Sequence, residues 1–507
     1  MNDKFIMALD EGTTSARTLI IDSKGDIVAS SQEEIAMSYP AAGWVEQDAL
    51  EIWNTQRTTI QNVMNYGGFK GEQIAGIGIT NQRETVVVWD KESGQPIYNA
   101  IVWQDRRTEN DIKKIPAAMK KQIIEKTGLI PDAYFSATKL KWILDNIPGA
   151  KEKAKAGKLA FGTINTWLIW RLTKGQAFVT DPTNASRTML YNLQTKTWDK
   201  DLLKYFDIPE QMLPEIKSNS EVYGKTFEGL ISHADKTSIP IASSIGDQQA
   251  ALVGQLGLKK GDTKITYGTG CFILMNIGEQ PLISKNGLLT TVGYQINNKT
   301  TYALEGSVMI AGAAIQWLRD NLRIVYSSAE TEWYVEQARK NPNAPQVYFV
   351  PSFSGLGSPY WDPSSRGAIF GLDRSVRRED IVKATVESLA FQANDVLNAM
   401  KEDSGIIKKI KVDGGAAKND YLMQFQADIS QSMLERPKNV ETTGLGAAYL
   451  AGIATGVWKD FDDIRTKRKI DKIFNFTRTE DDVKPLLHGW DMAVGRTRNW
   501  LTDLEKD

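Results

Sequence analysis

Two short segments of similar design, one opening each half of the chain, constrain the fold most. Apolar residues 4–9 run into the polar segment Asp10-Glu-Gly-Thr-Thr-Ser15, and apolar residues resume over 17–22. Much later, residues 264–270 end in Gly-Thr-Gly, and apolar residues again follow over 271–277. Each segment predicts two strands joined by a turn of glycine and hydroxyl residues. The second half therefore begins as the first does.

The chain of 507 residues is long enough for two or three domains, and this restart predicts two, 1–252 and 253–507. Apolar runs alternate with helical periodicity, as is typical of an α/β protein. The clearest helix is 379–402, whose apolar stripe indicates a core-facing side. From residue 459 the charged, amphipathic sequence predicts a closing helical cap. The other predicted strands are 26–35, 74–80, 85–89, 239–245, 301–304, 347–350 and 410–413, and the other helices are 49–64 and 421–432.

Charge and cysteine content exclude several classes of function. Lys and Arg (61) nearly balance Asp and Glu (62), so no net field favours nucleic acid or an anionic membrane. The most apolar run, 307–318, is far shorter than the ~20 residues of a spanning helix, so we expect no stable membrane insertion. The single Cys271 cannot form an internal disulfide, and with two histidines it cannot build a Cys/His metal site. A reducing, cytoplasmic location is expected.

Three turns could bind the phosphates of a nucleotide. Gly12 would let backbone N–H groups approach phosphate oxygens, and three hydroxyl residues follow it. Taken alone, this turn could equally be a polar hairpin. The turn at 268–270 is the second, and the third is Asp413-Gly-Gly-Ala-Ala-Lys-Asn419, where paired glycines would let a flat ligand lie on the backbone before a helix N-terminus. The three together resemble the superfamily of sugar kinases, heat-shock ATPases and actin.

Another group of residues suits a polyol. Arg83 and Glu84 follow a predicted strand and pair a donor fork with an acceptor carboxylate, which can hold vicinal hydroxyls. Trp103 and Tyr134 add aromatic surface. Asp247 lies at a predicted strand end just before the domain boundary, where a carboxylate could take the proton of an attacking hydroxyl.

Several longer segments resemble the FGGY family of carbohydrate kinases, and within it the branch that uses glycerol. The resemblance covers nearly the whole chain and is carried by 81–84 with Trp103, and by 161–170, 181–190, 246–252, 267–270, 303–306, 355–362 and 444–452. It implies a two-domain actin-like ATPase fold of ribonuclease H-like repeats with an interdomain catalytic cleft. It also implies ATP- and Mg²⁺-dependent phosphorylation of glycerol to sn-glycerol 3-phosphate, a step of glycerol uptake and catabolism, and a homodimer or homotetramer.

The resemblance also implies residue roles. Asp247 would be the general base, and Asp10 would hold Mg²⁺ through water. The residues implied to bind glycerol are Arg83, Glu84, Tyr134, Asp247 and Gln248, with Trp103 and Phe272 walling its carbon chain. Those implied to bind the nucleotide are Thr13, Thr14, Ser15 and Arg17 at the transferred phosphate, Thr269 and Gly312 at the later phosphates, and Gln316, Gly415 and Asn419 beyond them.

Two positions depart from the family pattern or leave a choice open. Glu11 stands where the family usually has Gln, and we expect its side chain to point outward from the turn. His233 has the spacing of a histidine that a phosphocarrier protein phosphorylates in some relatives, but the usual aromatic and glycine neighbours are missing. A solvated loop histidine is the alternative. For the whole chain, the alternatives are a kinase for another polyol or a sugar such as xylulose, and a nucleotide-driven binding module.

Overall fold

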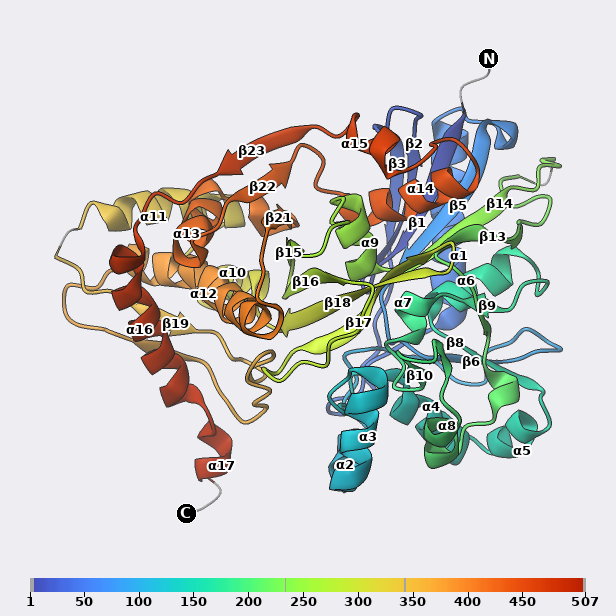
Figure 1. Cartoon of the computed structure of the whole chain (residues 1–507), viewed down its shortest axis with the longest axis horizontal. Coiled ribbons are helices and arrows are strands. Elements are labelled where there is room, and N and C mark those ends of the chain that lie inside the picture. Colours follow the sequence, from blue (N-terminus) through green and yellow to red (C-terminus); the bar gives the residue numbers. More distant parts are fainter. Residues whose placement is uncertain (1–3, 233, 342, 505–507) are drawn as a thin grey trace.

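The computed structural model describes residues 4–232, 234–341 and 343–504, and two mixed β-sheets organise it (Figure 1). The first sheet has the order β13-β14-β5-β1-β2-β3. β1 is antiparallel to β2 and parallel to β5, and β5 is parallel to β14. The carboxyl ends of β1, β5 and β14 therefore share one edge. The strands are β1 (Phe5–Glu11), β2 (Ser15–Ile21), β3 (Ile27–Glu34), β5 (Ile74–Asn81), β13 (Ser220–Lys225) and β14 (Pro240–Gly246).

The second sheet repeats this arrangement with one added strand. Its order is β17-β18-β16-β15-β21-β22-β23. β15 is antiparallel to β16 and parallel to β21, and β21 is parallel to β22. The strands are β15 (Asp262–Tyr267), β16 (Cys271–Gly278), β17 (Leu289–Ile296), β18 (Lys299–Val308), β21 (Lys409–Asp413), β22 (Leu434–Pro437) and β23 (Ile470–Phe474).

Helices cover both sheets. α1 (Ala49–Tyr66) packs on the first sheet, where Met7 and Leu9 share a core with Ile52 and Trp53. α12 (Arg378–Ser404) and α13 (Asp420–Ser430) pack on the second sheet, and α10 (Gly312–Asp320), α11 (Thr331–Arg339) and α16 (Glu480–Thr497) contribute to the same apolar core. None of the described helices has the length and apolar character needed to cross a membrane.

We call residues 4–254, built on the first sheet, the first lobe, and the described residues from 255 onward, built on the second sheet, the second lobe. Two helices cross between the lobes. α14 (Thr442–Ala454), from the second half of the chain, packs on β1, β5 and β14 of the first sheet (Figure 1). α9 (Asp247–Gly254) sends Leu252 against Leu274 and Ala303 of the second sheet. The two helices touch closely, since a Cβ on Gly446 would lie 1.9 Å from the carbonyl oxygen of Ala250. Each lobe thus covers part of the other lobe's sheet.

A layer of short elements lies between β5 and β13. Phe135, Leu140 and Phe161 belong to a separate apolar core within this layer, whereas residues 164–172 of the layer pack into the core of the first sheet. The layer positions the residues that follow β5. Its elements are β6 (Val87–Asp90), β7 (Ala100–Ile101), β8 (Leu159–Gly162), β9 (Val179–Thr180), β10 (Tyr191–Asn192), β11 (Thr197–Trp198), β12 (Glu215–Ile216), α2 (Glu109–Lys114), α3 (Ala117–Thr127), α4 (Ser136–Asn146), α5 (Ala150–Lys155), α6 (Ile164–Leu172), α7 (Pro182–Ala185) and α8 (Lys200–Phe206).

Most predicted elements are confirmed within one to three residues, including both strand pairs that open the halves. The prediction of a purely helical C-terminal cap is wrong in part. α15 (Phe461–Arg465), α16 and α17 (Trp500–Leu504) are helical, but β23 pairs antiparallel with β22 at the sheet edge. Four of its five residues are exposed, so its apolar pattern is weak. Strand β17 was not predicted. The boundary at residue 252 remains a prediction; it falls inside α9.

Candidate active site

Charged side chains gather at the shared edge of the first sheet. Asp10 lies near the end of β1, Arg83 and Glu84 follow β5, and Asp247 follows β14. Arg83 Nε lies 3.1 Å from Asp247 Oδ1. Carboxyl ends of neighbouring parallel strands are the usual place for ligands in open α/β sheets. The predicted acceptor residues are therefore brought together by topology.

Arg83 is the centre of a buried polar network. Its two terminal nitrogens lie 2.6 and 2.9 Å from the carboxylate oxygens of Glu305, a bidentate pair. They also donate to Gln249 Oε1 at 3.2 Å and to the Tyr134 hydroxyl at 3.5 Å. With Asp247 on Nε, every edge of the guanidinium faces a protein acceptor. Asp247, whose side chain is 31% exposed, is the most exposed member of this network.

Glu305 and Arg187 belong to the network but were not predicted as site residues. Arg187 donates to Glu84 Oε1 at 2.6 Å and to Glu305 Oε1 at 3.1 Å, and all three side chains are buried. Burial opposes ionisation of Glu305, but Arg187 and Arg83 lower its pKa to about 2. Both residues lie inside the segments 181–190 and 303–306 that carry the family resemblance, which was the available indication.

Glu84 adopts an unusual backbone conformation. Its φ of 63° lies in the left-handed region, which a non-glycine residue adopts only when its surroundings hold it. The Ser136 hydroxyl donates to its carbonyl oxygen at 2.9 Å. Burial raises the pKa of Glu84, although Arg83 and Arg187 oppose the shift. In the described part of the chain no group donates a hydrogen bond to its second carboxylate oxygen, Oε2.

Aromatic side chains join this network to the first glycine turn. The Trp103 indole donates to Thr13 Oγ1 at 2.9 Å. Its ring lies 5.6 Å from that of Tyr134 and 6.4 Å from that of Phe272, centroid to centroid, both edge-to-face. Trp103 and Tyr134 come from the first lobe and Phe272 from β16 of the second. The predicted walls are thus neighbours and span the two lobes.

Hydrogen bonds to its backbone fix the first glycine turn. Gly12 N–H donates to Ser15 O at 3.0 Å, and Gln47 donates to Thr13 O at 2.7 Å. The Arg17 side chain is held in place, because it forms an ion pair with Glu441 of the second lobe and donates to Gln32. This turn therefore presents hydroxyls and backbone N–H groups, and the Arg17 guanidinium lies beside it, held by the Glu441 carboxylate of the second lobe.

The two neighbouring carboxyl groups of β1 point to opposite faces of the sheet. Burial raises the pKa of Asp10 to about 7; Arg17 opposes this shift, and Asp247 and Glu441 add to it. The expectation that Glu11 points outward is wrong: its side chain is fully buried, and neither carboxylate oxygen has a hydrogen-bond partner among the described residues. Strand alternation puts Glu11 on the same face as Met7 and Leu9, which α1 covers. Burial and Asp10 raise its pKa well above the ordinary value.

A buried lysine orients Gln248. Lys264 on β15 donates to Gln248 Oε1 at 2.5 Å, and Gln248 in turn donates to Asp247 Oδ2 at 3.1 Å. Burial lowers the pKa of Lys264 to about 8. The lysine was not predicted, because its place in an apolar strand gave no indication of a polar contact. It connects the second lobe to the carboxylate at the end of β14.

The second and third glycine turns border one cavity of about 540 Å³ in the second lobe. Gly414 has a φ of 87°, and a Cβ there would lie 2.5 Å from Tyr267 O, so only glycine allows the two turns to approach. Asn419 caps α13 by accepting from Leu422 N–H at 2.8 Å. All five residues predicted to bind the later phosphates and the nucleotide line this cavity: Thr269, Gly312, Gln316, Gly415 and Asn419.

Comparison with known proteins is consistent with this architecture. The model of the N-terminal domain of the FGGY family of carbohydrate kinases matches residues 5–254, and that of the C-terminal domain matches residues 263–455. The chain belongs to the FGGY family of carbohydrate kinases.

Individual FGGY relatives match over almost the whole chain. A glycerol kinase of Mycoplasma capricolum is 58% identical over 503 residues, 99% of both chains. The crystal structure of Plasmodium falciparum glycerol kinase with ADP is 37% identical, has a TM-score of 0.90 and covers 98% of both chains. A gluconate kinase of Lactobacillus acidophilus, 23% identical with a TM-score of 0.88 over 99% of this chain and 100% of that one, shares the fold.

Two single residues of this FGGY kinase remain to be described, Cys271 and His233. Cys271 is buried, and burial raises the pKa of its thiol, so it fills space and is not a nucleophile. His233 lies outside the described residues, so its predicted phosphorylation remains untested.

Proposed function

We propose that this chain transfers the γ-phosphoryl group of ATP to a terminal hydroxyl of glycerol, giving sn-glycerol 3-phosphate and ADP. The observation that carries the proposal is the Trp103–Thr13 hydrogen bond, which sets the acceptor network of Arg83, Glu84 and Asp247 against the first glycine turn. The relatives of this chain that are named glycerol kinases, at 58% identity, support the same acceptor.

On the acceptor side, Asp247 would take the proton of the attacking hydroxyl. Its side chain is the most exposed of the Arg83 network. Glu84 Oε2 is an open acceptor for a second hydroxyl, and Tyr134 and Gln248 complete a polar lining. The rings of Trp103 and Phe272, 6.4 Å apart from centroid to centroid, contact each other and form one continuous aromatic wall, along which the carbon chain of glycerol would lie. Arg83 would orient Asp247 and Tyr134 as well as the substrate.

On the phosphate side, backbone N–H groups and hydroxyls would stabilise the charge that spreads over the equatorial oxygens in the transition state. Thr13, Thr14, Ser15 and Arg17 would contact the transferred group. For Arg17 to do so, its ion pair with Glu441 must open or be shared with the phosphate. Thr269 and Gly312 would hold the later phosphates, and Gln316, Gly415 and Asn419 the nucleoside.

The carboxylates of this site fit a magnesium ion that enters the site bound to the nucleotide phosphates. Asp10 and Asp247 repel one another electrostatically, which a cation between them would relieve. Among the described residues no group of three or more Asp, Glu, His or Cys could hold a metal, so most ligands would be water and phosphate oxygens, as Mg²⁺ prefers. When bound, Mg²⁺ would neutralise phosphate charge, and Asp10 would hold it through water.

A coupled assay of ADP release tests the proposal. Mg-ATP is supplied with no acceptor, glycerol, xylulose or gluconate, and we expect release only with glycerol. Release with xylulose or gluconate alone would indicate a sibling kinase. A rate indifferent to every polyol would instead indicate a nucleotide-driven binding module and overturn the proposal.

We further propose a cytoplasmic location and a homodimer or homotetramer. The single, buried cysteine fits a reducing compartment. Sedimentation velocity on the full chain would measure the assembly. A role for a phosphocarrier protein at His233 would be removed if phosphoenolpyruvate and the carrier left this residue unlabelled.

A further inference from the structure

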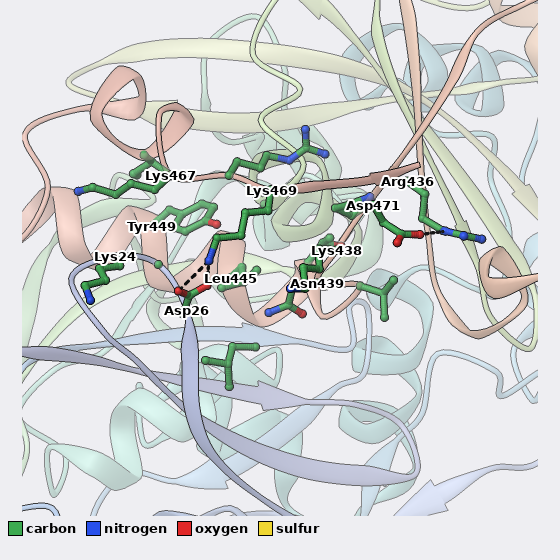
Figure 2. Close-up of a pocket in the computed structure, with 18 of the residues that line it drawn as sticks. Lys24, Asp26, Arg436, Lys438, Asn439, Leu445, Tyr449, Lys467, Lys469 and Asp471 are labelled. Carbon is green, nitrogen blue, oxygen red and sulfur yellow. Dashed lines mark hydrogen bonds and ion pairs between the residues drawn. The ribbon is translucent and has the colours of Figure 1, made fainter. Parts of the chain in front are cut away.

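A second, larger cavity of about 640 Å³ lies outside the candidate active site. It is formed by the β2–β3 turn of the first lobe together with β22, the start of α14 and the segment that leads into β23 (Figure 2). Of its lining residues only Lys418 also borders the nucleotide cavity. Its size falls in the usual range for small-molecule sites, roughly 300–1,000 Å³.

Cations dominate the lining. Seven lining residues are lysine or arginine and two are aspartate. Both aspartates are already paired: Asp26 with Lys469 at 3.2 Å, and Asp471 with Arg436 at 2.7 Å (Figure 2). The cationic residues are Lys24, Lys418, Arg436, Lys438, Lys467, Arg468 and Lys469.

Three of these cations have no partner. In the described part of the chain, the ammonium groups of Lys24, Lys418 and Lys438 make no hydrogen bond and no ion pair, and all three side chains are exposed. Lys467, by contrast, pairs with Asp463, and Arg468 with Glu435. A hollow lined by unneutralised charge of one sign concentrates ligands of the opposite sign.

The cavity is a formed site with a fixed floor. Tyr449 and Trp458 pack edge-to-face with ring centroids 5.7 Å apart. The Trp458 indole donates to Ser23 O at 2.9 Å and so ties the β2–β3 turn to the end of α14. The positive end of α14, a helix of 13 residues, begins beside the cavity at Thr442. The floor would hold a small ligand in a defined place.

We propose that this cavity binds a small molecule carrying two or more phosphoryl groups. Two groups fit because the cations lie at two ends: Lys24, Lys467 and Lys469 surround Tyr449, whereas Lys438 lies near Arg436 and Asn439 (Figure 2). Lysine ammonium groups bind phosphate oxygens as point charges.

The ligand would touch both lobes. Lys24 belongs to the first sheet's β2–β3 turn, whereas Lys418 lies between β21 and α13 and Lys438 directly follows β22 of the second sheet. A ligand that bridges them stabilises the relative placement of the lobes seen here, by mass action. The cavity is therefore suited to an effector of lobe movement that never enters the active site.

Calorimetric titration with inorganic pyrophosphate tests the proposal. The protein is first saturated with ADP, so that the nucleotide cavity is filled. The double variant K24Q/K438Q removes two unpaired cations, and K204Q/K285Q removes two exposed lysines elsewhere as a matched control. We expect pyrophosphate to bind the native chain and the control alike, and binding to K24Q/K438Q to be at least about tenfold weaker.

Glycerol-dependent turnover without pyrophosphate should be the same in all three proteins, which shows that K24Q/K438Q is folded. The proposal fails if pyrophosphate does not bind, if ADP abolishes its binding, or if both double variants bind it equally. It also fails if single-stranded RNA binds through Lys24 and Lys438 while pyrophosphate does not.

Discussion

The two lobes share a strand order but carry different chemistry at corresponding places. In both sheets an antiparallel strand pair opens the lobe, and two parallel strands lie beside its first strand. At the ends of β1, β5 and β14 the first lobe has Asp10, Arg83, Glu84 and Asp247. At the ends of β15 and β21 the second lobe has glycines, Thr269 and Asp413, whose buried carboxylate accepts from Gln255 and Thr442. One scaffold thus carries side chains suited to proton transfer in one lobe and backbone suited to close ligand contact in the other.

The difference follows from what each ligand needs. A polyol is small and uncharged, so side chains must form hydrogen bonds with its hydroxyls and accept a proton from one of them. A nucleotide is flat and anionic, and bare backbone with helix N-termini suits it. Variants of the first lobe should therefore change the chemical step and charge balance, whereas variants of the second and third glycine turns, in the second lobe, should change nucleotide affinity alone.

The largest effect is expected for Asp247→Asn. Removing the proposed general base at the end of β14 should lower kcat by about 10²–10⁴-fold, because no group would then take the proton of the attacking hydroxyl. The KM for ATP should change little, since the nucleotide cavity lies in the other lobe. Steady-state kinetics measures both. Asp481→Asn, at an exposed site on α16, is the control; a kcat within tenfold of the native value would contradict the assignment.

Glu305→Gln should destabilise the fold by about 3–5 kcal/mol, because it leaves Arg83 and Arg187 buried without their shared carboxylate. The pKa of Glu305 is lowered to about 2, so its ionised form stabilises the fold above its ordinary value of 4.5. That stabilisation is lost as the pH falls from about 4.5 to about 2.

Urea unfolding across this pH window measures the effect. The gap between native and Glu305→Gln proteins should close as the pH falls. Glu336→Gln, an exposed position on α11, should match the native protein throughout. A gap that stays constant with pH would show that Glu305 is not held ionised by the two arginines.

Asp10→Asn should stabilise the nucleotide-free protein at alkaline pH. The pKa of Asp10 is raised to about 7, so ionising its carboxyl destabilises the fold, increasingly from its ordinary value of 3.8 up to about 7. The gain should be on the order of 2–4 kcal/mol at pH 8 and vanish near pH 3.8. Thermal unfolding at both pH values checks this; an equal gain at both would contradict it.

The smallest effect is expected for Gly415→Ala. A Cβ at this position meets no atom within 4 Å, so folding should be unaffected while the methyl group occupies the nucleotide cavity. We expect the KM for ATP to rise about tenfold, with glycerol KM unchanged. Gly495→Ala on α16 adds a Cβ to equally open space away from the cavity and is the matched control. A rise in the KM for glycerol of the same size would contradict the assignment of nucleotide binding to the second lobe alone.

Features encoded locally could be predicted from the sequence. The glycine turns, both opening strand pairs and helix α12 follow from short patterns of apolar, glycine and hydroxyl residues. The candidate acceptor residues were also predicted, because Arg83, Glu84 and Asp247 each follow a strand. Their meeting in space depended on β1, β5 and β14 being parallel neighbours.

Features that depend on distant contacts could not be predicted. Glu305 meets Arg83 across 222 positions of sequence, and Arg17 meets Glu441 across 424. The burial of Glu11 depends on α1 covering one face of β1. Edge strand β23 lacked a clear pattern because only Phe474 of its five residues is buried. In each case the missing information is which element packs opposite.

The reciprocal crossing of α9 and α14 has a consequence for how the chain is made. The ribosome releases the first sheet long before residues 442–454 exist, so the face that holds Ile6, Ala8 and Leu19 has no cover during most of synthesis. Leu445 and Ala448 close it only when the chain is nearly finished. The first lobe therefore cannot mature as an independent unit, and a nascent chain stalled before α14 would carry an open apolar face that chaperones can bind.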